Sequence, residues 1–368
     1  MTTLYFPDEK VPLHPTRLSE GTASLLPDQT CPAVLWTIDL DADGRTESVD
    51  VRRALVRSRA KLDYAHVQKS IDDGTAEEPL ALLKEIGTLR ERLEVERGGI
   101  SLNVPEQEIV EKDGTYELGY RAPLPADAWN AQISLLTGMA AADLMLAHGT
   151  GVLRTLPAAP TARSAACAAR PGPCTSTGRT TSRTRNSSAP STRTCRATRP
   201  SSRSARRCCA ARATRCSGRR PPGRHLARRR GRPYAHCTAP LRRLVDRYAS
   251  ELCLAAAADE PPPDWVLTAL DSLPKEMAEG SRRAGTVERE CVDIVEAALL
   301  KDRVGDIFDG CVVDVMERQP TVGTVQLESP AVVARIEGGT GTLPLGERLR
   351  VRLTQADLGT AKVRFAPA

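Results

Sequence analysis

The chain has 368 residues, of which 27% are charged and 40% hydrophobic, and its formal net charge is +6. This charge comes from residues 161–233, which contain 20 arginines and no lysine, aspartate or glutamate. The remainder has 32 basic against 46 acidic residues, so the net charge does not indicate a basic surface over the whole chain. There is no apolar signal core or membrane-length apolar run, and the cysteines outside that segment are scattered. We therefore expect a soluble, cytoplasmic protein without a membrane partner.

Residues 1–160 carry the signals of an ordinary α/β domain. Prolines punctuate residues 1–30, which predicts an extended surface segment. The elements expected after it are a strand pair flanking an Asp43-Gly44 turn, a short helix capped by Asp63, a longer helix ending at Gly98-Gly99, a strand pair around Asp113-Gly114, and a helix over about 127–148.

Two apparent sites in this domain have simpler explanations. Residues 39–50, DLDADGRTESVD, superficially fit a calcium-binding EF-hand loop. However, the eighth residue is Thr46 rather than an apolar residue, and both flanks alternate as strands, which favours a polar hairpin turn. The histidines do not predict a catalytic triad, because no serine or cysteine stands at a readable spacing from His66, His148 or His236.

Residues 161–233 have almost no large aliphatic side chains, so they cannot bury enough apolar area to fold, and we expect them to be disordered. One interpretation is an evolved basic arm that binds nucleic acid. Arms of that kind usually include lysine and stacking aromatics, whereas this segment is rich in cysteine and has sharp edges. We favour the alternative that it is a frameshifted stretch. Its six cysteines form no CxxC pair, which argues against a zinc site.

After this tract, apolar residues recur at helical spacing from Leu241 to Leu252, with Pro240 suited to the first turn. Arg242 and Arg243 are then expected in that first turn. Free backbone N–H groups and guanidinium groups together would suit a phosphate there. A solvated basic edge explains the same spacing equally well.

The last part of the chain predicts a long helix followed by a barrel. The helix is expected over about 275–302, with an apolar stripe at Val287, Cys291, Ile294, Val295, Ala298 and Leu299. Five short, glycine-punctuated strands from Gly305 onward predict a small closed barrel of the OB type. This barrel has 7 basic against 8 acidic residues, so its net charge does not suggest RNA affinity.

Several motifs, in the same order, resemble those of the ribonuclease II/ribonuclease R (RNB) family of exoribonucleases. The most specific is YAHCTAPLRRLVDR at 234–247, which is close to the family's YAHFTSPIRRYxDLxxHR. The other stretches are TLYFPDEKVPLHPTRLSEGTASLLPDQ, ESVDVRRALVRSRAKLDYAHVQ, RGGISLNVPEQEI and VERECVDIVEAALLKDRVGDIFDGCVVDV. The resemblance implies an α+β (mixed α/β) fold, in which residues 1–160 and 234–304 form a partial RNB catalytic domain and residues 305–368 an OB-type RNA-binding barrel.

The resemblance also implies roles for individual residues. Tyr5 matches the aromatic residue that stacks on the 3′-terminal end of the RNA. Arg242 matches the arginine that stabilises the scissile phosphate, and Glu288 the catalytic glutamate beside it. Arg243 is implied as a further RNA-binding residue or as a support for its neighbour. From spacing alone, Glu288 would be an ordinary surface charge on its helix.

The sequence also departs from the family pattern. The resemblance implies Mg²⁺ as the cofactor, held by a D-x₅-D-x-D-D cluster before the tyrosine motif, but this cluster of aspartate ligands is missing from the 368 residues. The stretch NAQISLLTGM has Leu136 and Thr137 where the family pattern has two acidic residues. We therefore expect a chain truncated at its N-terminus, with weak or no hydrolysis.

The first functional hypothesis is a 3′→5′ hydrolytic exoribonuclease for RNA degradation, impaired in this chain. The alternatives are a non-catalytic RNA-binding protein and a non-functional gene fragment. For either of the first two, the expected partner is single-stranded RNA. No small-molecule cofactor is expected, and we expect a monomer.

Overall fold

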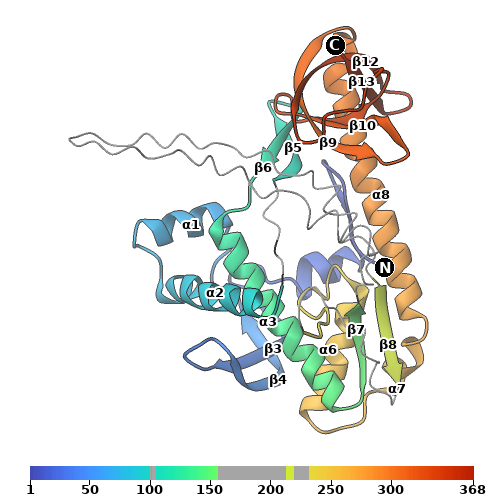
Figure 1. Cartoon of the computed structure of the whole chain (residues 1–368). Helices are drawn as coiled ribbons and strands as arrows, with labels where there is room; N and C mark the ends of the chain where they lie inside the picture. Colours follow the sequence, from blue (N-terminus) through green and yellow to red (C-terminus); the bar gives the residue numbers. More distant parts are fainter. Residues whose placement is uncertain (100, 102–104, 156–212, 219–231) are drawn as a thin grey trace, which may run out of the picture. The chain divides into compact units, whose positions relative to one another are not determined.

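The computed structural model describes residues 1–99, 101, 105–155, 213–218 and 232–368. Figure 1 shows these residues as a mixture of helices and strands, as the sequence predicts. They form two compact units, one reaching to Val295 and the other running from Glu296 to Ala368. The boundary lies within helix α8 (Leu273–Leu300). Among the helices of the described residues, none is both long and apolar enough to cross a membrane.

The first unit contains two β-hairpins that the turn signals predicted. Strand β3 (Thr30–Leu40) pairs antiparallel with β4 (Thr46–Arg57), and β5 (Glu106–Lys112) pairs antiparallel with β6 (Thr115–Arg121). In the first turn, the carboxylate of Asp41 accepts hydrogen bonds from the backbone nitrogens of Asp43 and Arg45, at 3.0 and 2.7 Å. Gly44 has a φ of +77°, which favours glycine. The hairpin interpretation of this acidic turn is therefore confirmed.

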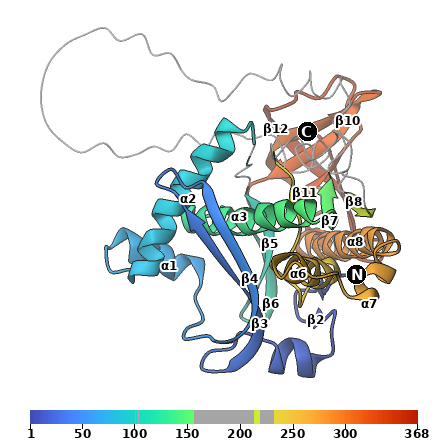
Figure 2. The ribbon, with the colours of Figure 1, turned by 90° about the horizontal axis from the view of Figure 1, so that it is seen from below.

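Three helices follow the first hairpin and pack on one another. Helix α1 (Tyr64–Asp72) begins at the expected cap, because the Asp63 carboxylate accepts from the backbone nitrogen of His66 at 3.0 Å. Helix α2 (Glu78–Glu96) approaches α3 (Pro125–Ala147) closely, since a Cβ at Gly87 would lie only 2.5 Å from Trp129. As Figure 2 shows, α3 lies between α6 (Leu244–Ala257) on one side and the pair formed by α1 and α2 on the other.

The main core of the first unit lies between α3 and α6. Buried residues of α3 and α6 meet side chains from β4, from β7 (Thr150–Thr155), and from a short helix that the sequence did not predict, α7 (Asp264–Ala269). Residues 213–218 of the arginine-rich tract form strand β8, antiparallel to β7. Most other residues of that tract lie outside the described residues. The expectation that the tract is disordered therefore stays a prediction there.

The second unit is a closed five-stranded barrel, which confirms the prediction. Its strands are β9 (Ile307–Met316), β10 (Gln319–Leu327), β11 (Val333–Ile336), β12 (Arg348–Asp357) and β13 (Lys362–Pro367). They are ordered β10-β11-β13-β12-β9, with β11 parallel to β13 and the other pairs antiparallel. The barrel's two aromatic rings, Phe308 and Phe365, meet edge to face inside it, with their centroids 5.9 Å apart.

The apolar stripe predicted for α8 is partly wrong. Ile294 is 49% exposed and Ala298 is also exposed, whereas Val295, Ala297 and Leu300 are buried. Glu296 is buried among them, and its carboxylate accepts a hydrogen bond from the backbone nitrogen of Val333 at 2.8 Å. The predicted stripe is partly wrong because this end of the helix buries the Glu296 carboxylate, which accepts a hydrogen bond from a backbone N–H of the barrel. The spacing of apolar residues does not reveal such a hydrogen bond.

Candidate functional site

The N-terminal residues pair with the turn that precedes α6, although about 240 positions separate them. Thr2 and Arg243 form an antiparallel bridge. The carbonyl oxygen of Arg242 accepts from the backbone nitrogen of Thr3 at 3.1 Å and from the Thr2 hydroxyl at 2.7 Å. Because Tyr5 lies only three residues beyond Thr2, its Cα is within about 11 Å of this bridge along the chain. The pairing thus places Tyr5 and Arg242 in the same region.

The same N-terminal segment lies along α8. The Met1 ammonium group donates to the carbonyl oxygen of Glu276 at 2.9 Å, and a Cβ at Gly280 would lie 2.8 Å from the Met1 Cα. Further along α8, burial raises the pKa of the Cys291 thiol, and the charge of Asp8 raises it as well. Glu288 is exposed and lies on α8 between Gly280 and Cys291, one helical turn before Cys291. Glu288 therefore belongs to the stretch of α8 that follows the contact with Met1.

The expectation that both arginines lie in the first turn of the helix is wrong. Helix α6 begins at Leu244, Arg243 is its N-cap with extended backbone (φ −134°, ψ 123°), and Arg242 belongs to the turn before it. The bridge to Thr2 requires this extended conformation at Arg243, and the Leu244 nitrogen donates to the Met1 carbonyl at 3.2 Å. A contact with a distant segment, rather than local propensity, thus sets the start of the helix.

Arg243 directs its guanidinium group toward its own helix. Its Nε donates to Oδ1 of Asp246 at 2.7 Å and its Nη2 donates to Oδ2 at 2.8 Å. Asp246 is fully buried and also accepts from the backbone nitrogen of Ala239 at 3.2 Å. Burial raises the pKa of Asp246, and the bonds from Arg243 oppose that rise. The pair of Arg243 with the buried Asp246 therefore ties the turn at Ala239 to the first turn of α6.

Arg242 differs from its neighbour because its side chain is exposed. Within the described part of the chain, its guanidinium group has no hydrogen bond or ion pair, while its carbonyl oxygen is held by Thr2 and Thr3. A cation whose backbone is anchored at two points and whose head group faces solvent is available to bind an anion.

Tyr5 is an exposed aromatic residue of the same N-terminal segment. It lies in the short strand β1 (Leu4–Tyr5), opposite Lys10 of β2 (Lys10–Val11), and is 57% exposed. No hydrogen bond or ion pair connects the side chains of Tyr5, Arg242 and Glu288 to one another among the described residues. Tyr5 and Arg242 are connected through the N-terminal segment, and Glu288 lies on the helix that Met1 contacts.

Tyr234 and Ala235, the first two residues of the YAHC motif, pack against α3 and hold the chain just before the turn that carries Arg242. The backbone nitrogen of Ala235 donates to the Gly138 carbonyl at 2.9 Å, and a Cβ at Gly138 would lie 2.1 Å from Cε2 of Tyr234. Leu136 and Thr137, which occupy the two acidic positions of the family pattern, are buried in α3 beside this contact. Sequence reasoning missed Gly138 and Asp246. The glycine inside a helical pattern and the aspartate three residues after Arg243 were the available signals.

The described residues do not fit a divalent metal ion. They contain no group of three or more His, Cys, Asp or Glu side chains that could hold one. Asp39 accepts a hydrogen bond from Ser48, and Asp41 holds its own turn, so the acidic hairpin does not supply such a group. The geometry thus supports phosphate binding by a cation and stacking on an aromatic ring, both from this chain's own residues.

Comparisons with known proteins agree with the order of the motifs. Residues 1–258 match the family model described as the RNB domain, and residues 306–368 match the RNase II-type exonuclease C-terminal S1 domain. Ribonuclease R of Aquifex aeolicus is 28% identical over 116 residues, and an uncharacterised ribonuclease of Synechocystis is 27% identical over 153 residues. These alignments span 29% and 41% of this chain, but only 16% and 23% of the two relatives.

Solved structures show the same fold. RNase R of Mycoplasma genitalium, in complex with ribose-methylated single-stranded RNA, has a TM-score of 0.80 at 15% identity, covering 100% of this chain and 62% of that one. Yeast Ssd1, described as a pseudonuclease, has a TM-score of 0.66 at 13% identity, covering 98% of this chain and 44% of that one. The chain thus spans less than two thirds of the length of these relatives. At such identities the likeness shows the fold alone.

Proposed function

Because the chain belongs to the RNB family and carries an S1 domain of the RNase II type, we propose that it binds the 3′ end of single-stranded RNA. The family points to a 3′→5′ exoribonuclease, and we propose that residues 1–368 by themselves hydrolyse RNA weakly or not at all.

The observation that carries the proposal is the arrangement of Arg242. Its backbone is held by Thr2 and Thr3, and its guanidinium group is free of hydrogen bonds and ion pairs with described residues. A guanidinium fork matches the geometry of phosphate oxygens and neutralises their charge. Tyr5, anchored through the same segment, offers its exposed ring to a terminal base. A phosphate contact beside a stacking contact is what the end of a single strand requires.

Two further residues complete the proposed site. Arg243 acts as a positioning residue, since its bonds to the buried Asp246 hold the turn from which Arg242 projects. Glu288 is the candidate acidic group beside the bound phosphate, because α8 presents its exposed carboxylate next to the N-terminal segment.

The proposal of weak hydrolysis rests on the set of side chains present. Water activation and neutralisation of phosphoryl charge are the tasks that a divalent metal performs in phosphodiester hydrolysis. The described residues do not fit the Mg²⁺ expected for the family, so no step through a metal is assigned to them. The fold alone does not decide activity, because it is shared with RNase R and with a protein described as a pseudonuclease.

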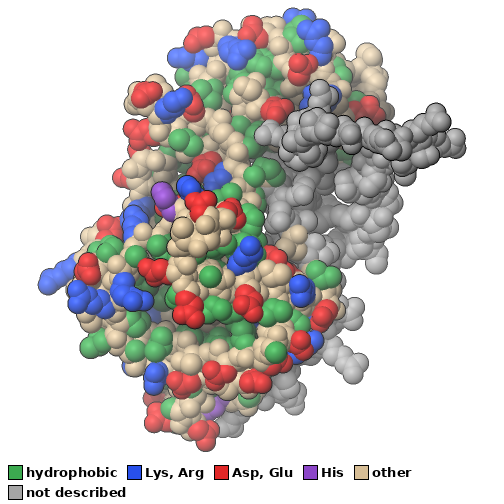
Figure 3. Space-filling view, turned by 90° about the vertical axis from the view of Figure 1, so that its left-hand side faces the viewer, with side chains coloured by type: hydrophobic (Ala, Val, Ile, Leu, Met, Phe, Trp, Pro, Cys, Tyr) green, Lys and Arg blue, Asp and Glu red, His purple; other side chains and the backbone are tan. Residues whose placement is uncertain are grey.

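The second unit offers a further surface for RNA. Arg348, Arg350 and Arg352 alternate along β12 and are all exposed, so they lie in a row on the outer face of the barrel. Arg350 lies opposite Asp309 of β9, which moderates the positive charge at the centre of the row. On the face shown in Figure 3, basic and acidic side chains are interspersed. Local rows of arginine, rather than net charge, therefore support RNA binding by this unit.

The proposal is tested by the affinity for a 5′-labelled oligouridylate, measured by fluorescence anisotropy. Arg242→Ala removes the phosphate contact and should weaken binding about tenfold, the effect of one charge-assisted hydrogen-bonded contact. Tyr5→Ala removes the stacking platform and should weaken binding by a similar factor.

The matched control is Arg52→Ala, which removes an exposed arginine of β4 that makes only a long ion pair with Asp50. It should bind the oligonucleotide as the unchanged protein does. If Arg242→Ala and Arg52→Ala bound RNA equally well, the assignment of the phosphate contact to Arg242 would be wrong.

A further inference from the structure

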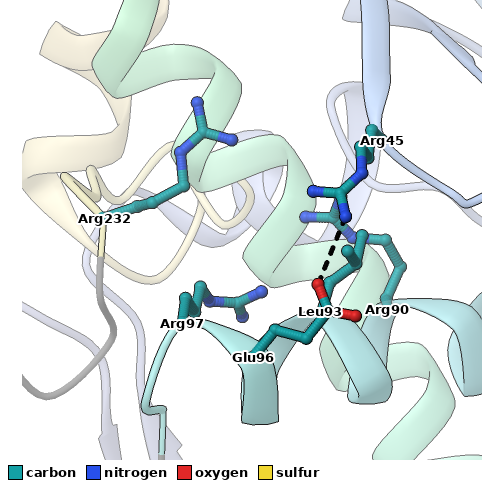
Figure 4. Close-up of a pocket in the computed structure, with 6 residues that line it drawn as sticks. All are labelled: Arg45, Arg90, Leu93, Glu96, Arg97 and Arg232. Atoms are coloured by element: carbon teal, nitrogen blue, oxygen red, sulfur yellow. Dashed lines mark hydrogen bonds and ion pairs between the residues drawn. The ribbon is translucent and has the colours of Figure 1, made fainter.

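A second basic site lies in the first unit, where the turn of the β3–β4 hairpin meets the C-terminal half of α2. It is a pocket with a volume of about 260 Å³, lined by Arg45, Arg90, Leu93, Glu96, Arg97 and Arg232. As Figure 4 shows, these side chains come from three segments of the chain: the hairpin turn, α2 and the residues just before Tyr234. None of them belongs to the site around Arg242.

Positive charge exceeds negative charge in the pocket wall. Four of the six lining residues are arginines and one is an acid. Glu96 accepts from Arg45 at 3.2 Å, and Arg232 pairs with Asp143 at 2.7 Å. An anion in the pocket would relieve the repulsion among these cations.

Among the four arginines that line the pocket, Arg90 is the buried one. It is only 3% exposed, and its Nη1 donates to the Gly44 carbonyl oxygen at 2.8 Å. Its buried Nε–H finds no acceptor among the described residues. Burial, together with the charges of Arg97 and Arg232, lowers the pKa of Arg90 to about 10, so the group stays protonated at neutral pH. A buried guanidinium group that makes one hydrogen bond leaves a positive charge in the pocket wall that no described acid pairs with.

The arginine side chains and the volume of the pocket indicate the class of ligand that it would bind. Planar guanidinium groups bind tetrahedral phosphate through paired N–H donors, and such bonds are stronger than those between neutral groups. The volume of the pocket exceeds that of a bare phosphate ion and leaves room for a group attached to the phosphate.

We propose that the pocket lined by Arg45, Arg90, Arg97 and Arg232 binds the phosphate group of a nucleotide, either free or within an RNA strand. Arg90 supplies a buried positive charge, Arg45 and Arg97 supply hydrogen-bond donors, and Glu96 opposes binding because it pairs with Arg45. This inference does not rest on the proposed role of Arg242, and either one can fail without the other.

The test is isothermal titration calorimetry of the purified full chain with inorganic phosphate and with uridine 5′-monophosphate. Arg97→Gln removes one donor and one positive charge and should weaken binding of both probes about tenfold. Glu96→Gln removes the competing carboxylate and frees Arg45, so it should tighten binding severalfold. Both residues lie near the end of α2, and circular dichroism verifies that each variant remains folded.

A second ion pair on the same hairpin provides the matched control. Arg57 of β4 pairs with Asp28 at 3.4 Å, and both side chains are exposed. Arg57→Gln and Asp28→Asn change the net charge by the same amounts without touching the pocket, and should leave both affinities unchanged. Equal affinity of Arg97→Gln and Arg57→Gln, or no tightening in Glu96→Gln, would overturn the assignment, as would the absence of binding to the unchanged chain.

A competition experiment distinguishes the two sources of the phosphate. A uridine dinucleotide without terminal phosphates is added before the titration with inorganic phosphate. Displacement of phosphate by this dinucleotide supports a site for the RNA backbone. Binding of the monophosphate alone supports a site for free nucleotides.

Discussion

Arg242 and Arg243 are adjacent in sequence and yet have different surroundings. The guanidinium group of Arg243 donates to the buried carboxylate of Asp246, whereas that of Arg242 faces solvent. The difference arises from the extended backbone at Arg243, which pairs with Thr2 and turns the two side chains to opposite sides. Only one of the two arginines is thus available to a ligand, and the other stabilises the turn that carries it.

A second buried carboxylate permits a prediction about pH. Glu251 of α6 is almost fully buried and accepts hydrogen bonds from Arg247 and from Arg53, the latter at 2.6 Å. Burial alone would raise the pKa of Glu251, but the bonds from Arg247 and Arg53 hold it below its usual value. A carboxyl group whose pKa is lowered by folding stabilises the folded state above its unfolded pKa of about 4.3. That stabilisation is lost as the pH falls through the folded pKa.

Glu251→Gln should therefore lower the free energy of unfolding by about 1–3 kcal/mol at neutral pH, because two charge-assisted bonds are weakened. The difference between variant and unchanged protein should shrink as the pH falls below about 4. Urea unfolding at several pH values measures it. Asp73→Asn, which removes an exposed partner of Lys69, is the control and should change stability by less than about 0.5 kcal/mol. A difference that stayed constant with pH would contradict the role assigned to Glu251.

Among the helices, α3 allows a neighbouring segment to approach closely at one position, Gly138. The YAHC stretch contacts α3 where Gly138 has no side chain, and a Cβ there would lie 2.1 Å from Tyr234 and 2.6 Å from the Ala235 carbonyl oxygen. This contact precedes the turn that carries Arg242. The packing of this segment against α3 therefore helps to position the turn that carries Arg242.

Gly138→Ala should destabilise the protein by about 1–3 kcal/mol, because the added methyl group overlaps Tyr234 and backbone atoms that cannot move far. Gly285→Ala on α8 is the matched control. A Cβ there would have only the Arg289 guanidinium group within 4 Å, at 3.6 Å, so helix propensity should dominate and stabilise the protein by about 0.5–1 kcal/mol. Thermal unfolding followed by circular dichroism compares the two. Stabilisation by both changes would show that the approach of Tyr234 to α3 is not close.

Across the whole molecule, the features that could be predicted from the sequence are those that depend on residues close together along the chain. The Asp43-Gly44 turn, the Asp63 cap and the five strands after Gly305 each depend on short-range signals, and all are present. The motif YAHCTAPLRRLVDR identified the family for the same reason, since its residues are contiguous.

The features that sequence did not predict depend on contacts between distant segments. The pairing of Thr2 with Arg243 moved the start of α6 to Leu244, and no local pattern contains that pairing. Buried acids such as Asp246 and Glu296 look like surface charges until their partners are seen. The pocket around Arg90 likewise combines three segments whose spacing in sequence carries no signal.

We propose that the whole chain binds the end of single-stranded RNA through Arg242 and hydrolyses it weakly or not at all. The most direct measurement is a denaturing gel of a 5′-labelled oligouridylate, incubated with the purified chain and Mg²⁺ at concentrations where anisotropy shows the RNA to be bound. We predict that the bound RNA keeps its length, while Arg242→Ala releases it. Stepwise, Mg²⁺-dependent shortening from the 3′ end, abolished in Arg242→Ala, would contradict the claim and identify an active nuclease.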